Sequence, residues 1–259
     1  MVEGIKLRVI TIVQARMGAT RLPGKPLMEV RERPLLSYQV ERLRRCRNVD
    51  EIVIATTNKE TDQPIVDFCR HEQVPFFRGD ENDVLARYLQ AAKAFSADVV
   101  VRITGDCPLI DPVIVDFAVG FYLESYPSFD YVSNVLPDSR TYPRGLDVEV
   151  FSFKSLEKAA LQSHAQEFRE HVTLYIYEHP EEFKLGSFIA APDMSNYRWT
   201  VDTPEDFQLI STILETVYPK NPTFTYSDLL KEFEIHPEWI KINAHVEQKP
   251  MRNHARHKP

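Results

Sequence analysis

Residues 7–14 read LRVITIVQ, an apolar run rich in β-branched side chains, and lead into the loop ARMGATRLPGKP at 15–26. Three more short runs with apolar residues follow at Glu51–Thr56, Pro75–Arg78 and Asp98–Thr104, and the first and last of them are also rich in β-branched side chains. Longer amphipathic segments separate them, and this alternation predicts βαβ units around a parallel sheet. Such a sheet is expected to be buried on both faces. The helices of this half are expected at about 34–46, 61–73 and 82–95.

The pattern changes after Asp111, where a helix is expected near 111–125. The stretch Leu146–Phe153 alternates apolar and polar residues, which predicts a half-exposed antiparallel strand. We interpret about 120–190 as a region inserted within a single domain of residues 1–259. The remaining predictions are a helix pair at about 154–178, strands at about 183–190 and Tyr197–Val201, a helix that begins at Thr203-Pro204-Glu205, and a frayed tail, PMRNHARHKP, at 250–259.

The composition excludes several classes of function. The chain of 259 residues is 43% apolar and carries 38 acidic against 31 basic residues, a formal net charge of −7. No run of basic residues interleaved with aromatics is present, so nucleic acid is not expected as a partner. No apolar stretch approaches the roughly 20 residues that span a bilayer, so no membrane partner is expected and we predict a cytoplasmic protein. No pair of cysteines has the C-x-x-C spacing typical of zinc or redox sites.

The loop after the first strand has the composition of a phosphate-binding loop. Gly18 and Gly24 allow close approach of a ligand to the backbone, and Arg16, Arg21 and Lys25 add three cations. The glycine spacing and the proline after the lysine do not fit a Walker A loop, and no G-x-G-x-x-G dinucleotide fingerprint is present. We predict polyphosphate binding. The alternative is a solvated basic turn.

Two aspartates directly follow predicted strands. Asp106 lies in the sequence GDCP after Asp98–Thr104, and Asp202 follows YRWTV. Because ligands of open parallel sheets bind beyond the carboxyl ends of the strands, both carboxylates are candidates for Mg²⁺ and for phosphate chemistry. The alternative is that each caps a turn or a helix, and Asp202 precedes a helix-start sequence.

Taken together, these segments resemble the cytidylyltransferases of acidic-sugar activation, which include the acylneuraminate and 3-deoxy-manno-octulosonate enzymes and the type named for spore coat polysaccharide biosynthesis (SpsF). The matching segments span almost the whole chain. They are QARMGATRLPGKPL at 14–27, GDENDVLARY at 79–88, VRITGDCPLIDP at 101–112, RGLDVEVF at 144–151, EHVTLYIYEHPEEF at 170–183, RWTVDTPEDF at 198–207 and INAHVEQK at 242–249.

The resemblance implies an α/β fold of the nucleotide-diphospho-sugar transferase type: GT-A-like and Rossmann-like, with three layers, a mostly parallel central sheet and an antiparallel inserted region. It implies transfer of CMP from CTP to a sugar or sugar-acid acceptor, with Mg²⁺ as cofactor, pyrophosphate as product, and a homodimer formed through the inserted region. Biosynthesis of a surface polysaccharide or glycoconjugate is the expected setting.

The resemblance also implies roles for individual residues. Arg16 and Lys25 would bind the CTP phosphates, and Asp106 and Asp202 would hold the metal; these four form the expected catalytic set. The expected nucleotide-binding residues are Gln14, Ala15, Arg16, Gly18, Arg21, Lys25, Thr56, Thr57, Arg87 and Asp106.

The acceptor is expected near Arg144, Asp147, Glu149 and His171. Asp147 and Glu149 share one face of a predicted strand and could bind sugar hydroxyls, while Arg144 could pair with an acceptor carboxylate. The alternatives are a solvated strand face and a structural histidine. Where the sialic-acid enzymes carry a hydroxyl-rich stretch, this chain reads ENDVLAR at 81–87, which argues against sialic acid as the acceptor.

Two other functions remain as alternatives. A glycosyltransferase of the same fold would consume a sugar nucleotide, but the D-x-D metal motif expected of it is absent. A non-catalytic nucleotide-binding protein would be favoured if Lys25, Asp106 or Asp202 were missing, and all three are present.

Overall fold

The computed structural model describes residues 6–248 and contains a seven-stranded sheet with the strand order β5-β4-β1-β6-β8-β7-β9. Strands β5, β4, β1 and β6 run parallel, and β8 pairs antiparallel with both β6 and β7. The four strands predicted for the first half are therefore confirmed and form the parallel part of the sheet. The strands are β1 (Val9–Gln14), β4 (Glu51–Thr57), β5 (Phe76–Gly79), β6 (Val99–Thr104), β7 (Tyr131–Ser133), β8 (Glu149–Ser152) and β9 (Leu185–Ser187), beside a small hairpin of β2 (Glu29–Val30) and β3 (Arg33–Pro34).

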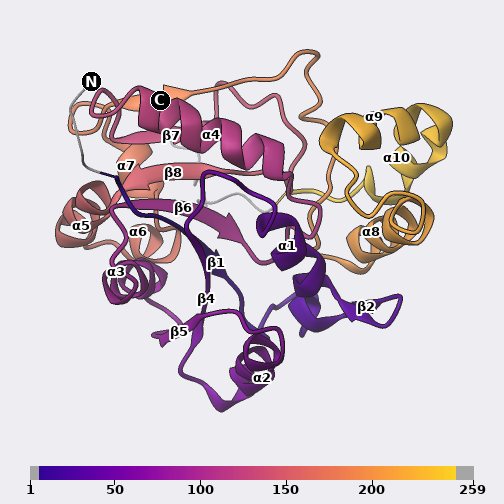
Figure 1. The fold of residues 1–259 in the computed structure, drawn as a ribbon, viewed down its shortest axis with the longest axis horizontal. Helices are drawn as coiled ribbons and strands as arrows, with labels where there is room; N and C mark the ends of the chain where they lie inside the picture. The colour runs from indigo at the N-terminus through magenta and orange to yellow at the C-terminus, as the bar shows by residue number, and fades with distance from the viewer. Residues whose placement is uncertain (1–5, 249–259) are drawn as a thin grey trace, which may run out of the picture.

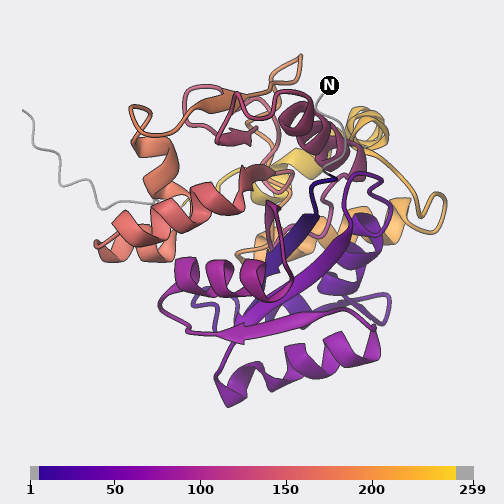
Figure 2. The same ribbon diagram turned by 60° about the vertical axis from the view of Figure 1, so that its left-hand side comes forward.

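Helices cover both faces of this sheet, as Figures 1 and 2 show. The α-helices are α1 (Leu35–Leu43), α2 (Gln63–His71), α3 (Val84–Ala94), α4 (Pro112–Glu124), α5 (Phe153–Gln162), α6 (Gln166–Glu170), α7 (Leu174–Glu178), α8 (Pro204–Val217), α9 (Tyr226–Ile235) and α10 (Ile240–Asn243). Three short 3₁₀ segments complete the described elements: η1 (Lys25–Leu27), η2 (Glu60–Asp62) and η3 (Pro237–Trp239).

The alternation of side chains along each strand divides the core into two clusters. Val13 and Val101 pack with α1, α2, α4 and α8 on one face, whereas Ile12 and Val100 pack with α3, α5 and α7 on the other. This is the period of two that a strand imposes on its side chains. The prediction of a sheet buried on both faces is confirmed.

The antiparallel strand predicted at Leu146–Phe153 is confirmed as β8, but the prediction that it is half exposed is wrong. Strand β8 lies between β6 and β7, and its residues Glu149, Val150 and Phe151 are all buried. Phe151 and Tyr175, two aromatic residues of the region at about 120–190, are both buried in the core. The polar residue Glu149 of β8 is bound inside the protein by Arg102, Tyr131 and Thr173, so the alternation does not mean that one face meets water.

The segment 154–178 forms three helices, α5, α6 and α7, instead of the predicted pair. The break between α6 and α7 falls at Val172, whose φ of 47° is incompatible with a continuous right-handed helix. The predicted strand Tyr197–Val201 is also wrong. Only an isolated bridge between Arg144 and Arg198 forms there, because the neighbours of this segment are loops and not strands.

The last helices gather at one side of the molecule, in orange and yellow at the right of Figure 1. The predicted start of α8 is confirmed: Thr203 is its N-cap, with Asp206 completing a capping box. Within residues 6–248, none of the helices has the length and apolar character needed to cross a bilayer. The tail predicted at 250–259 lies outside the described residues.

Candidate active site

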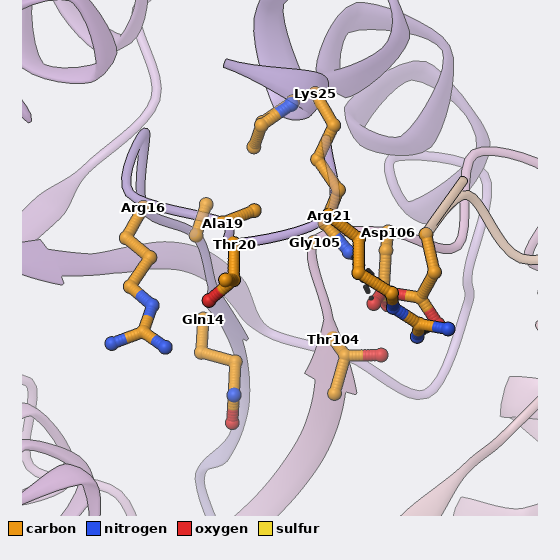
Figure 3. Close-up of a pocket in the computed structure, with 12 residues that line it drawn as sticks. Gln14, Arg16, Ala19, Thr20, Arg21, Lys25, Thr104, Gly105 and Asp106 are labelled. Atoms are coloured by element: carbon orange, nitrogen blue, oxygen red, sulfur yellow. Dashed lines mark hydrogen bonds and ion pairs between the residues drawn. The ribbon is translucent and has the colours of Figure 1, made fainter. Parts of the chain in front are cut away.

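A cavity of about 240 Å³ lies beyond the carboxyl ends of β1 and β6 (Figure 3). This is the edge at which open parallel sheets bind their ligands. The cavity is lined by the end of β1, the loop that follows it, the end of β6, and the segment before α8. The lining residues are Gln14, Ala15, Arg16, Ala19, Thr20, Arg21, Lys25, Pro26, Thr104, Gly105, Asp106 and Asp202.

The loop after β1 is held in a compact shape by backbone hydrogen bonds. The N–H of Gly24 donates to the carbonyl of Met17 at 2.8 Å, and Gly24 has a φ of 75°, which favours glycine. The N–H of Met17 donates in turn to the carboxylate of the buried Asp62, at 2.7 Å. Lys25 follows at the first position of η1, so its side chain starts from a fixed turn.

Asp106 is positioned by the glycine before it. The N–H of Gly105 donates to the carbonyl of Gln14 at 2.8 Å, and a Cβ on Gly105 would lie only 2.7 Å from that oxygen. Glycine is therefore required for this close approach of β6 to β1. The carbonyl of Asp106 accepts hydrogen bonds from the N–H of Val201 at 2.9 Å and from the hydroxyl of Thr200 at 3.1 Å. These bonds bring the chain segment that carries Asp202 next to β6.

Three charged side chains meet at this point. The ammonium of Lys25 lies 2.9 Å from Oδ2 of Asp106 and 2.7 Å from Oδ1 of Asp202. Burial alone would lower the pKa of Lys25, but the two carboxylates raise it above its ordinary value. Burial would likewise raise the pKa of Asp106, yet Lys25 and hydrogen bonds from Thr104 hold it well below its usual range. Lys25 and Asp106 are therefore both charged at neutral pH.

The second oxygen of Asp202 is bound by two arginines. Its Oδ2 lies 3.0 Å from Arg21 and accepts a hydrogen bond of 2.8 Å from Arg198. Because Thr203 is the N-cap of α8, the alternative that Asp202 caps this helix is excluded. Its carboxylate faces the cavity instead.

Arg16 stands apart from this cluster. In Figure 3 it lies on the other side of Gln14 and Thr20 from the pair of Lys25 and Asp106. Its guanidinium is 3.6 Å from Glu81, and 42% of its side chain is exposed. The two cations predicted to bind phosphates therefore line opposite sides of the cavity.

The other residues predicted to bind the nucleotide divide into two groups. Thr56, Thr57 and Arg87 are almost completely buried and do not line the cavity; Thr57 donates to Asp62, and Arg87 to the carbonyl of Asp80. Gly18 is exposed on the loop, outside the lining. Seven predicted residues do line the cavity: Gln14, Ala15, Arg16, Arg21, Lys25, Asp106 and Asp202.

The four residues predicted to bind the acceptor are not among those that line this cavity. Asp147 forms a bidentate pair with Arg140, at 2.7 and 3.1 Å. Glu149 is buried against Arg102. His171 ends α6, its backbone N–H bonded to Glu167.

Arg144 lines a second cavity of about 100 Å³, together with Arg198 and Trp199. Burial, and then the neighbouring Arg140, lower the pKa of Arg144. The next residue, Gly145, has a φ of 100°, and a Cβ there would collide with the carbonyl of Trp199. This close packing fixes the backbone beside Arg144.

Several lining residues were not singled out from the sequence. Thr104 and Gly105 belong to the same strand end as Asp106, and that position was the signal that could have identified them. Arg198 and Asp206 do not line the cavity but bind Asp202. The only sequence signal for these contacts was that the three residues lie close together in RWTVDTPED. Ala19, Thr20 and Pro26 carry no chemical signal beyond membership of the loop.

The two carboxylates fit a divalent cation whose coordination is completed by oxygens of the substrate. Two carboxylates converge on one cationic group, and carboxylate oxygens are the protein ligands that Mg²⁺ prefers. Among residues 6–248 there is no cluster of three or more His, Cys, Asp and Glu side chains suited to a metal. An ion held by one or two carboxylates, with phosphate oxygens and water as its other ligands, is the usual form for Mg²⁺.

Comparison with known proteins identifies the family. Residues 10–237 match the family model described as cytidylyltransferase. The spore coat polysaccharide biosynthesis protein SpsF of Bacillus subtilis is 32% identical over 238 residues, which cover 89% of this chain and 95% of that protein.

Solved structures share the fold. A cytidylyltransferase from Leptospira borgpetersenii has a TM-score of 0.87 at 33% identity, with 95% of this chain and 100% of that chain covered. A CMP:2-keto-3-deoxy-manno-octonic acid synthetase complexed with CTP has a TM-score of 0.62 at 18% identity, covering 80% of this chain and 98% of that one. The family model and the long relatives agree with the fold, and the chain belongs to the cytidylyltransferase family.

Proposed function

We propose that this enzyme transfers CMP from CTP to a sugar or sugar-acid acceptor, with release of pyrophosphate and with Mg²⁺ as cofactor. The observation that carries the proposal is the meeting of Lys25, Asp106 and Asp202 at a cavity whose rim also carries Arg16 and Arg21. In this arrangement, cations that could bind a triphosphate lie directly beside carboxylates that could bind a metal. The relationship to SpsF supports a role in the biosynthesis of a surface polysaccharide or glycoconjugate.

Catalysis in this proposal depends on positioning and on charge. An acceptor oxygen attacks the α-phosphorus of CTP in line and pyrophosphate leaves, a reaction in which the protein mainly orients the reactants and stabilises charge. Asp106 and Asp202 would hold Mg²⁺, which when bound neutralises charge on the phosphate oxygens. Lys25 and Arg21 bind phosphate oxygens from the same side of the cavity, and Arg16 binds them from the other.

The position of Lys25 has a consequence for the order of these contacts. Its ammonium occupies the space between the two carboxylates that the metal would use. Two cations in this space would repel each other, so Lys25 would have to leave at least one carboxylate if Asp106 and Asp202 held a metal. Its ammonium would then be free to contact the triphosphate, whose negative charge would compensate it.

Gln14 and Ala15 lie at the end of β1, where we place the cytosine. The side-chain oxygen of Gln14 accepts a hydrogen bond of 3.2 Å from Arg102, which leaves the Gln14 amide N–H groups to face a ligand. For the acceptor we retain Arg144, which lines the second cavity. A homodimer formed through the region of about 120–190 is part of the same proposal.

The proposal is tested by measuring pyrophosphate release with each of the four common nucleoside triphosphates. Each is combined with a panel of acidic sugars, neutral sugars and sugar phosphates, with Mg²⁺ or with EDTA. We expect release to be fastest with CTP and to require both Mg²⁺ and an acceptor that carries a free nucleophilic oxygen. Binding of CTP without release for any acceptor would favour the non-catalytic alternative.

A further inference from the structure

The two carboxylate oxygens of Asp202 have different neighbours. Oδ1 faces Lys25 and, beyond it, Asp106, whereas Oδ2 is held by Arg21 and Arg198. A carboxylate whose one oxygen is bound by two guanidinium groups has its side-chain rotation fixed. Only Oδ1 then remains available on the side where Asp106 lies.

Arg198 is itself held in place by Asp206. Its Nε and Nη2 atoms donate to the two oxygens of Asp206 at 2.8 and 3.0 Å, and its Nη1 donates to Gln248 at 2.5 Å. Arg198 is 7% exposed, and Asp206 is completely buried. This bidentate geometry leaves the guanidinium one orientation, in which Nη2 also reaches Asp202.

Asp206 makes more contacts than a helix cap requires. Besides completing the capping box of α8 with Thr203, it accepts hydrogen bonds from the backbone N–H of Asp202 at 3.0 Å and from the amide of Asn243 at 2.8 Å. It therefore binds both the backbone of Asp202 and the arginine that binds the Asp202 side chain. Asn243 also donates to the carbonyl of Arg198, which ties α10 to the same network.

We propose that Asp206 is a positioning residue for the metal site: through Arg198 and through the Asp202 backbone, it holds Asp202 so that Oδ1 faces Asp106. The inference rests on the proposed metal-binding role of Asp106 and Asp202. Loss of a residue that holds a metal ligand in place typically lowers the affinity for the metal by about 10- to 100-fold.

The chain offers a matched control. Helix α9 begins with the same capping box, in which Thr225 is the N-cap and Asp228 completes it. Asp228 is bonded to the Thr225 N–H at 3.0 Å, and its cationic neighbour is Lys231, at 3.6 Å. Asp206→Asn and Asp228→Asn therefore make the same change to a capping box, but only Asp206→Asn also affects Arg198.

The experiment measures binding of Mn²⁺ alone to the full chain by electron paramagnetic resonance, with folding checked by circular dichroism and thermal melting. The variants are Asp206→Asn, Arg198→Lys and Asp228→Asn. We expect the Kd for Mn²⁺ to rise about 10- to 100-fold in the first two and to remain unchanged in Asp228→Asn. Arg198→Lys keeps the capping box intact, so it decides the question if Asp206→Asn fails to fold.

Two results would overturn the proposal in distinguishable ways. If the wild-type chain binds Mn²⁺ and the folded variants bind it equally well, Asp206 has only a capping role and the metal assignment stands. If the wild-type chain itself binds no Mn²⁺ at millimolar concentration, the metal assignment fails and the positioning role fails with it.

Discussion

The ammonium of Lys25 lies 2.7 Å from Oδ1 of Asp202, although 177 positions separate these residues in the sequence. The same nitrogen is bound to Asp106, so one cation bridges two carboxylates and offsets the repulsion between them. The loop after β1, the end of β6 and the segment before α8 are joined by this one side chain. Lys25 thus has a structural role, as the common partner of two carboxylates, and a proposed catalytic role in binding the triphosphate.

Replacement of Lys25 by alanine separates these two roles. We expect Lys25→Ala to fold but to lower turnover by about 10²-fold or more, because charge stabilisation of the triphosphate is lost. Without Lys25 the two carboxylates lack their common cation, so Mg²⁺ should raise the melting temperature of the variant more than that of the wild type. Lys6→Ala, which removes an exposed lysine paired with Asp50, is the control and should change neither property. Near-normal turnover in folded Lys25→Ala would show that Lys25 is only a structural residue of the basic loop and has no catalytic role.

Selectivity among nucleotides is the second prediction. We expect CTP to be preferred over UTP and ATP, an expectation that rests on membership of the cytidylyltransferase family. The value of kcat/KM is to be measured for each nucleotide with one acceptor at a fixed concentration. Equal or greater turnover with UTP would contradict the proposed substrate.

Glu149 provides a test of where the acceptor binds. It is buried, and its carboxylate accepts hydrogen bonds from Arg102, Tyr131 and Thr173. Burial alone would lower the pKa of Arg102, but Glu149 raises it above its usual value. Glu149→Gln leaves this arginine without a counter-charge, and we expect the free energy of unfolding to fall by roughly 3–5 kcal/mol. Urea unfolding measures this change. Unchanged stability combined with a raised KM for the acceptor would instead support the acceptor-binding role predicted from the sequence.

The proposed homodimer leads to a fourth prediction. Phe151 and Tyr175 are buried within the chain and are unavailable to a partner. Ile189 in the proposed region is 63% exposed, and Phe117 on α4, which lies just before the region and packs against its Phe188, is 56% exposed. Exposed apolar groups of this size favour association. We expect sedimentation to show a dimer in the wild type and a monomer in a variant that combines Phe117→Glu with Ile189→Glu. Ile235→Glu changes an equally exposed residue on α9 and should leave the dimer intact. A wild-type chain that remains monomeric at every concentration would reject the homodimer.

The parallel part of the fold could be predicted because its signals are local. Three of the four strands in the first half are short β-branched runs, the fourth, β5, is a short aromatic one, and a helix follows each strand along the chain. The loop after β1 and the aspartate after β6 could be placed at one edge for the same reason. The rule that parallel strands end at a common edge needs no knowledge of distant contacts.

The antiparallel region could not be predicted in the same way, since its structure depends on distant partners. The sequence of β8 alternates like that of a half-exposed strand, but its Glu149 is paired with Arg102 of β6, 47 positions away. Residues 197–201 have the composition of a strand, yet their backbone groups bond to Arg144 and Asp106 in loops. Partners of this kind carry no local signal, so neither the burial of β8 nor the loss of the Tyr197–Val201 strand could be read from the sequence.

The measurement that most directly tests the account is a double-variant cycle on the two carboxylates. Pyrophosphate release is compared among the wild type, Asp106→Asn, Asp202→Asn and the double variant, using CTP, Mg²⁺ and the best acceptor from the panel, with melting temperatures recorded for each. Asparagine keeps the shape of aspartate but is a poor Mg²⁺ ligand. If the two residues hold one metal, each single variant nearly abolishes turnover and the double variant is scarcely worse than either, as expected for residues that act as a unit. If Asp202→Asn retains activity, or if the two losses multiply in the double variant, Asp106 and Asp202 do not form a shared metal site.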